Sequence, residues 1–393
     1  MSIFIPSDAI RHLDEYKYQS EDRSLVTKYI LKPFWLKFER IFPIWMAPNM
    51  VTLLGLMFII ISDLLVLIYD PNLESISPKW VYFYHAFAVF MYQTFDACDG
   101  IHARRTGQSS PLGELFDHCC DAMNTTLMQI QFASVAGLTC NPLIFIFQYA
   151  SLATFYISTW EEFYTHKLFL SEISGPVEGL LMLATVYILA GIFGIETLFK
   201  MELFDISLPF INKTYTITTL MISIFLGFIT TSFSMYSAAN NVVNTLTKEK
   251  RLREINPAIR NIQPFNIYYA TVALLLFFNP SIIYNYTISM VITIGATISF
   301  VVGRIITGHL TKQKFPTFNL PTFIPMIQLI LLYIIPKLFD IPYIKALDIV
   351  VYSGLGLSIA IYGMFVTEII YDITTYLDIY ALSIKHPQIV KDE

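Results

Sequence analysis

The sequence predicts an all-α integral membrane protein with about ten transmembrane helices and an amphipathic helix near its N-terminus. Of the 393 residues, 55% are hydrophobic and only 14% are charged, and the mean hydropathy is +0.57. A soluble domain has about 25% charged residues, whereas a helix needs about 20 mostly apolar residues to cross a bilayer. Runs of that kind recur at residues 50–69, 80–97, 118–137, 142–160, 176–196, 216–238, 264–283, 286–306, 321–338 and 346–370. Because the chain has no long basic run, nucleic acid is not an expected partner.

Residues 24–42, which precede the first span, have the pattern of a helix that lies in the membrane interface. Apolar side chains recur there at helical spacing, with cationic residues between them: Leu31, Phe34, Trp35, Phe38, Ile41 and Phe42 alternate with Lys28, Lys32, Lys37 and Arg40. Such a helix places its aromatic rings among the lipid headgroups and its lysines on the phosphates. The alternative is a helix packed on the protein's own cytosolic surface. Pro33 is expected to divide this stretch or to start its main turn.

The cationic residues predict the orientation of the chain. With ten spans, twenty of the 25 Lys and Arg residues lie on the side that holds both termini, and five lie on the other side. The positive-inside rule therefore places both termini in the cytosol. A polar linker at 246–263 marks a boundary, so we expect an N-terminal arm at 1–45, catalytic helices at 46–245 and a C-terminal part at 246–393. The C-terminal helices carry no chemistry of their own, and either a homodimer contact or lipid access would account for them.

Four aspartates, Asp96, Asp99, Asp117 and Asp121, lie close together at the edges of two apolar runs. Hydrocarbon penalises a carboxylate by about 2.5–3.5 kcal/mol, so the cluster needs a cation or a substrate. The spacings i, i+3 and i, i+4 put each pair on one helix face, and the turn residues at 107–111 make the two helices antiparallel neighbours. The carboxylates can then converge on Mg²⁺ or Mn²⁺, which prefer carboxylate oxygen. We expect two ions, the arrangement that assists displacement at phosphorus.

Small residues beside the aspartates leave room for a bulky ligand. They are Gly100, Ala103 and Gly113, and Arg104 adds a planar cation that suits phosphate. The alternative makes the aspartates helix caps and ion-pair partners of Arg104 and Arg105. Four carboxylates outnumber these two arginines, which favours the metal site.

The aspartate stretch resembles the signature of the CDP-alcohol phosphotransferases, D-x-x-D-G-x-x-A-R-x8-G-x-x-x-D-x-x-x-D. Every fixed position matches: Asp96, Asp99, Gly100, Ala103, Arg104, Gly113, Asp117 and Asp121. Further stretches resemble the eukaryotic choline/ethanolaminephosphotransferases, namely Y-K-Y-Q-S-E-D-R-S (16–24), W-M-A-P-N (45–49), P-L-G-E-L-F-D-H (111–118), G-P-V-E-G (175–179) and L-D-I-Y-A-L-S-I-K-H-P (377–387).

The resemblance implies transfer of a phosphoalcohol from CDP-choline or CDP-ethanolamine to diacylglycerol, with release of CMP. It implies an enzyme of the endoplasmic reticulum or Golgi membrane, and the count of cationic residues puts the aspartates on the cytosolic side. The four aspartates would be metal ligands. Gly100, Ala103, Arg104 and Gly113 would surround the nucleotide and its phosphates, and Asn49 is a further expected nucleotide contact.

Two roles have more than one candidate. The base that takes the proton of the acceptor hydroxyl is either Asp121 or His118, and a histidine titrates near neutral pH, which favours His118. A cationic headgroup calls for aromatic faces and a carboxylate. Tyr92, Trp160 and Glu178 fit that description, although they also fit an aromatic belt at the interface with solvated charges.

Two alternative functions remain at this stage. One is a related transferase that uses another acceptor alcohol, such as inositol or glycerol phosphate, although such enzymes are usually smaller. The other is a cation-coupled transporter with the aspartates as its ion site. Transporters commonly place such sites near the bilayer midplane within inverted repeats, whereas this cluster lies at one face and the sequence has no convincing repeat.

Overall fold

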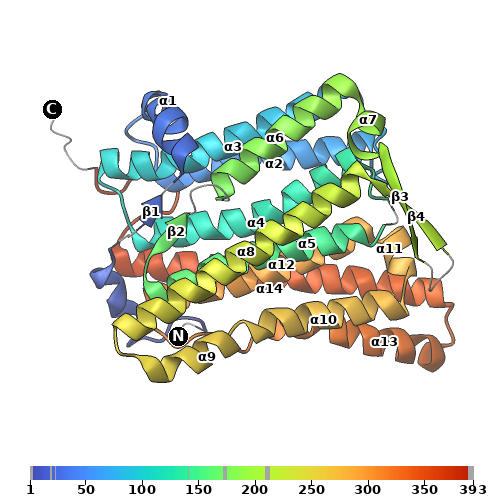
Figure 1. The fold of residues 1–393 in the computed structure, drawn as a ribbon. Helices are drawn as coiled ribbons and strands as arrows, with labels where there is room; N and C mark the ends of the chain where they lie inside the picture. The colour runs from blue at the N-terminus through green and yellow to red at the C-terminus, as the bar shows by residue number, and fades with distance from the viewer. Residues whose placement is uncertain are drawn as a thin grey trace.

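Ten long helices dominate the computed structural model, which describes residues 3–17, 20–22, 24–139, 141–170, 175–208 and 213–387. They run side by side as an elongated bundle (Figure 1). Proline lies in the first turn of several of them, where its missing N–H costs no hydrogen bond. Their bounds are α2 (Pro48–Tyr69), α3 (Lys79–Thr106), α4 (Pro111–Ala136), α5 (Leu143–Thr165), α6 (Pro176–Phe193), α8 (Thr219–Lys248), α10 (Gln263–Phe278), α12 (Thr287–Leu310), α13 (Ile324–Phe339) and α14 (Tyr343–Leu377).

A helix occurs at each of the ten predicted places, which confirms an all-α membrane architecture. Within the described residues, seven helices are long and apolar enough to cross a bilayer, so the count of ten spans stays a prediction. The helices outside this set are α3 and α4, which carry the aspartates and arginines, and α10, which is only 16 residues long.

The predicted run at 264–283 is too long at its C-terminal end. Helix α10 ends at Phe278, and Asn279 donates its side-chain amide to the Leu275 carbonyl at 2.9 Å. Pro280 follows, and the short α11 (Ser281–Asn285) turns away from the α10 axis before α12 begins. Proline lacks the N–H that would continue the helix, so the apolar run is divided into two elements.

The remaining elements are short connections at the two ends of the bundle. They include two small strand pairs that the sequence did not predict. Strands β1 (Ser20–Asp22) and β2 (Leu168–Leu170) pair in parallel, and β3 (Glu202–Leu208) and β4 (Lys213–Thr218) form an antiparallel hairpin at the opposite end (Figure 1). The short helices are η1 (Ile10–Glu15), η2 (Thr27–Leu31), α1 (Lys32–Phe38), η3 (Glu39–Ile41), α7 (Ile195–Phe199), η4 (Leu252–Glu254), α9 (Ile255–Arg260) and η5 (Leu320–Phe323).

The amphipathic stretch before α2 is helical and has two different faces. Leu31, Trp35 and Phe42 are buried against the protein itself, beside Phe95 and Cys98 of α3. The exposed face carries other apolar side chains and the lysines: Leu25, Tyr29, Ile30, Phe34, Leu36 and Ile41 lie with Lys28, Lys32 and Lys37. Half of the predicted interfacial residues therefore pack on the protein. Proline 33 lies in the first turn of α1, as the sequence predicts for a helix start.

A buried polar network fixes this stretch to α3. Glu39 is 2% exposed, and its Oε1 lies 2.7 Å from His102 Nδ1 and 2.8 Å from Arg105 Nε. The other ring nitrogen of His102 lies 2.9 Å from the Met46 carbonyl, and Arg105 donates to the Phe42 carbonyl at 2.6 Å. Glu39 and His102 received no role from the sequence, and the structure gives them a structural one.

The N-terminal arm at 3–17 docks on the opposite side, against α12 and α14. The Phe4 ring packs edge-on at 5.0 Å from Phe365 and 6.0 Å from Phe300, measured between centroids. The Gln313 side chain donates to the Phe4 carbonyl at 3.2 Å. The arm therefore joins the first residues of the chain to its last long helix.

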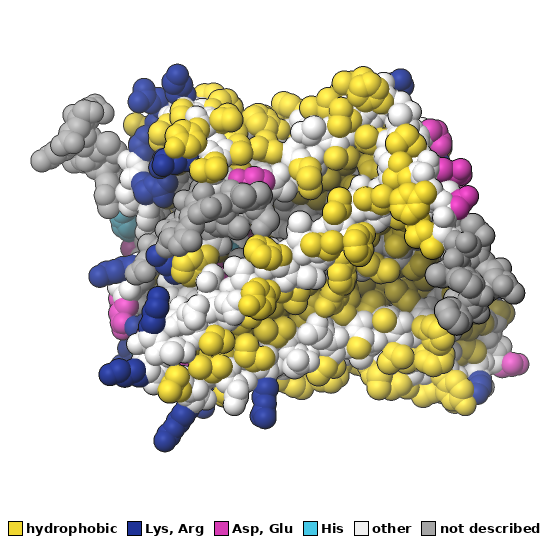
Figure 2. Space-filling model, in the orientation of Figure 1, with side chains coloured by type: hydrophobic (Ala, Val, Ile, Leu, Met, Phe, Trp, Pro, Cys, Tyr) yellow, Lys and Arg dark blue, Asp and Glu magenta, His cyan; other side chains and the backbone are white. Residues whose placement is uncertain are grey.

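Charge and apolar surface are separated along the bundle. Most Lys and Arg side chains in view gather at the end that holds the N-terminal arm and α1, and a band of hydrophobic side chains covers the middle (Figure 2). This pattern suits a chain that spans a bilayer with one strongly cationic end.

Helix α12 lies at the centre of the bundle, since 89% of its most apolar 18-residue stretch is buried inside the protein. It packs against α4, α5 and α14. At the closest point Gly295 faces Thr126 of α4, and a Cβ on this glycine would lie 2.2 Å from Thr126 Cγ2. Small residues let helix backbones approach closely in membrane bundles. A helix beyond the polar linker thus supports α4, which carries two of the aspartates.

Candidate active site

The site is built where α3 ends and α4 begins. Gly107 terminates α3 with φ 66°, a left-handed conformation that glycine adopts without steric cost. Ser110 then caps α4, its hydroxyl accepting from the Gly113 N–H at 3.3 Å, and Pro111 starts the helix. This short turn brings the last turns of α3 beside the first turns of α4.

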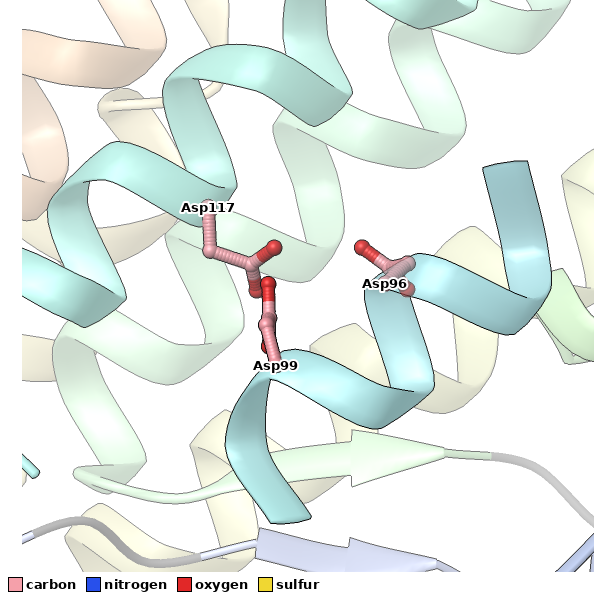
Figure 3. Close-up of side chains that lie close together, drawn as sticks. All are labelled: Asp96, Asp99 and Asp117. Atoms are coloured by element: carbon pink, nitrogen blue, oxygen red, sulfur yellow. The ribbon is translucent and has the colours of Figure 1, made fainter. Parts of the chain in front are cut away.

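Asp96, Asp99 and Asp117 converge from the two helices. One carboxylate oxygen of each lies within 4.8 Å of the others, and Figure 3 shows the three side chains directed toward a common space. One oxygen of Asp96 and one of Asp117 are buried without a hydrogen-bond partner. In the described part of the chain, no Lys or Arg forms an ion pair with the three carboxylates.

This arrangement fits a divalent cation. Three half-buried carboxylates at this separation repel one another strongly when ionised, and their unpaired oxygens are the ligands that Mg²⁺ and Mn²⁺ prefer. Two of the three residues, Asp96 and Asp99, come from one helix turn, and Asp117 comes from the facing helix.

Asp121 stands apart from these three in the structure. It is not part of the group whose oxygens lie within 4.8 Å of one another. Its carboxylate instead accepts a hydrogen bond from the hydroxyl of Tyr92, which is 2% exposed. Tyr92 was a headgroup candidate in the sequence, and the structure gives its hydroxyl the task of holding an aspartate.

Helix α2 completes the site although it carries no signature residue. It packs against both α3 and α4. The hydroxyl of Thr52, which is 2% exposed, donates to Asp99 Oδ2 and orients that carboxylate. Sequence reasoning missed Thr52, because a lone threonine in an apolar helix is common and carries no signal of its own.

The predicted nucleotide contacts surround the aspartates. A Cβ on Gly100 would lie 3.6 Å from Arg104 Nη1, so the guanidinium extends back beside this glycine, and Ala103 is half-buried next to it. A Cβ on Gly113 would lie 3.8 Å from Asn49 Oδ1. The structure thus brings Asn49, from the start of α2, to the glycine one turn before Asp117.

His118 faces α5. Its Nε2 lies 3.8 Å from Oε2 of Glu162, its ring centroid lies 6.4 Å from that of Phe155, and its Nδ1 is buried without a partner. His118 and Glu162 are 7% and 3% exposed. His118 follows Asp117 directly in α4, and its Nε2 is directed toward α5, a fourth helix.

The two remaining headgroup candidates have other partners. Trp160 is fully buried, and its indole N–H donates to the Ala258 carbonyl of α9 at 2.9 Å. Glu178, at the start of α6, accepts a hydrogen bond from the Ser24 hydroxyl. No contact joins Trp160 or Glu178 to the carboxylates among the described residues.

The structure contains an apolar cavity of about 340 Å³. It lies between α2, α4 and α14, and its lining includes Leu53, Phe116 and Cys120. These residues directly neighbour Thr52, Asp117 and Asp121 in the sequence. The cavity thus shares α2 and α4 with the site, although none of the carboxylates lines it.

Comparison with known proteins identifies the family. The family model described as CDP-alcohol phosphatidyltransferase matches residues 45–243. The chain is 45% identical over 397 residues to a yeast (Saccharomyces cerevisiae) protein named cholinephosphotransferase 1, which covers 99% of this chain and 100% of the relative. It is 47% identical, with the same coverage, to yeast choline/ethanolaminephosphotransferase 1, and 34% identical to choline/ethanolaminephosphotransferase 1 of Arabidopsis thaliana over 97% of this chain and 98% of the relative. The aspartate signature and these matches together show that the chain belongs to the CDP-alcohol phosphatidyltransferase family.

Proposed function

We propose that this chain transfers phosphocholine or phosphoethanolamine from the CDP-alcohol to the hydroxyl of diacylglycerol. The products would be phosphatidylcholine or phosphatidylethanolamine, together with CMP. The observation that carries the proposal is the convergence of Asp96, Asp99 and Asp117 in a chain that aligns end to end with relatives bearing these names.

Enzymes of this family use divalent metal ions, and the three convergent carboxylates would hold one here. We propose Mg²⁺ or Mn²⁺, with Asp121 as a fourth ligand that brings in a second ion. A bound divalent cation supplies charge neutralisation for the pyrophosphate and for the CMP that leaves. Thr52 and Tyr92 act by fixing the carboxylates of Asp99 and Asp121 through hydrogen bonds.

Binding of the donor falls to the residues around the small side chains. Gly100, Ala103 and Gly113 provide space for the phosphates and ribose, since a side chain there would narrow the gap between α3 and α4. Arg104 offers a planar cation beside Gly100, suited to phosphate oxygens. Asn49 faces Gly113 from α2 and would contact the nucleotide.

The acceptor has apolar tails, and the cavity between α2, α4 and α14 suits them. Its lining is apolar and includes the sequence neighbours of Thr52, Asp117 and Asp121. The acyl chains of the acceptor would lie among these side chains, with its hydroxyl directed toward the carboxylates. The end-to-end similarity to relatives named choline/ethanolaminephosphotransferases is the observation against inositol or glycerol phosphate as the acceptor.

His118 is the proposed base. It would take the proton of the acceptor hydroxyl as the oxygen attacks phosphorus, and Glu162, 3.8 Å from its Nε2, would stabilise the resulting imidazolium. General base catalysis contributes about 10²–10⁴-fold, so His118→Ala should lose turnover by that factor and keep CDP-alcohol binding. His166→Ala, an exposed histidine that caps α5, is the matched control. Near-normal turnover in His118→Ala would assign the proton transfer to Asp121.

The cationic end of the bundle would face the cytosol, with both chain ends, and the endoplasmic reticulum or Golgi membrane is the proposed location. CDP-alcohols are highly charged, and this orientation gives them direct access from the cytosol to the turn between α3 and α4.

The test is CMP release by the protein purified in detergent, with CDP-choline and CDP-ethanolamine compared side by side, with and without diacylglycerol. Mg²⁺ and Mn²⁺ are compared in the same assay, and Asp99→Asn serves as the inactive control. We expect CMP release that needs both metal and diacylglycerol. If neither CDP-choline nor CDP-ethanolamine yields CMP, this function is excluded, and the aspartates form an ion site of another kind.

A further inference from the structure

The chain after α14 returns to the active-site turn. Residues 378–387 leave the end of α14 and meet the segments just before α2 and just after α3. Ser383 forms an antiparallel bridge with Met46, just before α2. The Gln108 side chain, just after α3, donates to the His386 carbonyl at 3.2 Å. Figure 1 shows this end of the chain beside α1 and the end of α3.

The contact closest to the site is made by Asn49. Its Nδ2 donates to the Ala381 carbonyl at 3.0 Å, and its Oδ1 faces Gly113. Asn49 is 7% exposed and precedes Thr52 by one helical turn, so the two side chains lie on one face of α2. Because the Ala381 carbonyl accepts a hydrogen bond from Nδ2 of Asn49, Oδ1 of Asn49 is the atom that faces the space between α2 and α4.

The segment is closed on itself by charged side chains. Asp378, which caps α14 at φ 52°, accepts from Lys385 and lies 3.0 Å from His386 Nε2. The Lys385 ammonium also lies 5.3 Å from the centre of the Tyr380 ring. These contacts are exposed, so each stabilises the loop only weakly. Together they hold residues 378–386 in the compact form that reaches Asn49.

We propose that residues 378–387 form the outer wall of the nucleotide site and position Asn49 for the CDP-alcohol. This inference rests on the proposed function and adds a donor-binding element whose Ala381 lies 332 residues after Asn49 in sequence. The segment touches neither the carboxylates nor the apolar cavity. Its loss should therefore weaken donor binding and leave the chemical step and acceptor binding unchanged.

The experiment compares three altered proteins with the unaltered one. Gln108→Ala removes the bond to His386, Asp378→Ala opens the loop, and a chain ending at Leu377 lacks the whole segment. A chain ending at Pro387 keeps every contact described and is the control. KM for the CDP-alcohol, KM for diacylglycerol, kcat and thermal stability are measured for each.

We expect the two point variants to raise KM for the CDP-alcohol by about 2- to 10-fold, the effect of one hydrogen bond, with kcat and KM for diacylglycerol unchanged. The chain ending at Leu377 should show a larger rise, and the chain ending at Pro387 none. Equal changes in both KM values, or an unchanged donor KM in all three altered proteins, would overturn the positioning role while the proposed function stands. Absence of turnover in the unaltered protein would overturn both. If the chain ending at Leu377 does not fold, the point variants decide the question.

Discussion

The contact between Gly295 and Thr126 predicts a large effect for the substitution Gly295→Ala. The new Cβ would lie 2.2 Å, 2.3 Å and 2.6 Å from Cγ2, Oγ1 and Cβ of Thr126, where carbon atoms normally approach to about 3.5–4.0 Å. Rotation of the threonine cannot relieve a clash with its own Cβ. Helices α12 and α4 would therefore have to separate by about 1 Å or more, and overpacking of this kind costs about 1–3 kcal/mol.

Thermal unfolding in detergent measures this cost. At about 2 °C per kcal/mol for a chain of this size, the midpoint should fall by about 2–6 °C. The control is Gly356→Ala in α14, where an added Cβ meets nothing within 4 Å and the midpoint should stay constant or rise slightly. Thr126→Gly removes all three clashing atoms, so the double variant should recover part of the loss, and a double-mutant cycle gives the coupling. If Gly295→Ala unfolds like Gly356→Ala, the close approach of the two helices is not as described.

Three further predictions concern the site and its supports. Thr52→Val removes the hydroxyl that orients the carboxylate of Asp99 and should weaken metal-dependent turnover about 10- to 100-fold, measured in an Mg²⁺ titration. Thr185 is an exposed threonine of α6, and Thr185→Val should leave this turnover unchanged. Glu39→Ala removes the carboxylate that pairs with His102 and Arg105 and should lower the free energy of unfolding by about 3 kcal/mol, which thermal unfolding measures. An unchanged unfolding midpoint would mean that water replaces the carboxylate. The hydrogen bond from Lys385 holds the pKa of Asp378 below its usual range. The closed tail is therefore fully formed above the ordinary carboxylate pKa of about 3.9, and it opens as the pH falls through the lowered pKa. Amide hydrogen exchange of the tail, corrected for intrinsic rates, should rise on acidification, and Asp378→Asn should abolish this pH dependence.

The sequence predicted the helical architecture and the convergence of the aspartates because both depend on local spacing. Apolar runs of helical length identify the helices, and i, i+3 and i, i+4 spacings place Asp96 with Asp99 and Asp117 with Asp121 on single faces. The structure brings the first three together. Asp121 is a different case, because its hydroxyl partner Tyr92 lies on another helix and local spacing says nothing of it.

The parts that sequence reasoning did not predict depend on contacts between distant segments. Thr52 became relevant only because α2 packs against α3 and α4, and Glu162 because α5 passes His118. Trp160 fits a headgroup pocket by composition, yet helix packing turns its indole toward the Ala258 carbonyl. The sequence gives the type of each side chain, whereas helix rotation decides what that side chain meets.

The position of Phe4 determines when the N-terminal arm can dock during synthesis and folding of the chain. Its ring lies between Phe300 and Phe365, and the second partner is synthesised 361 residues later. At about 5–20 residues per second, translation of that interval takes about 20–70 s. During this time the arm that carries Phe4 and Ile5, both buried in the finished fold, leaves these apolar side chains exposed. Docking of the arm is thus one of the last steps in the folding of this chain, and a chain that stops short of α14 lacks the Phe365 ring against which Phe4 packs.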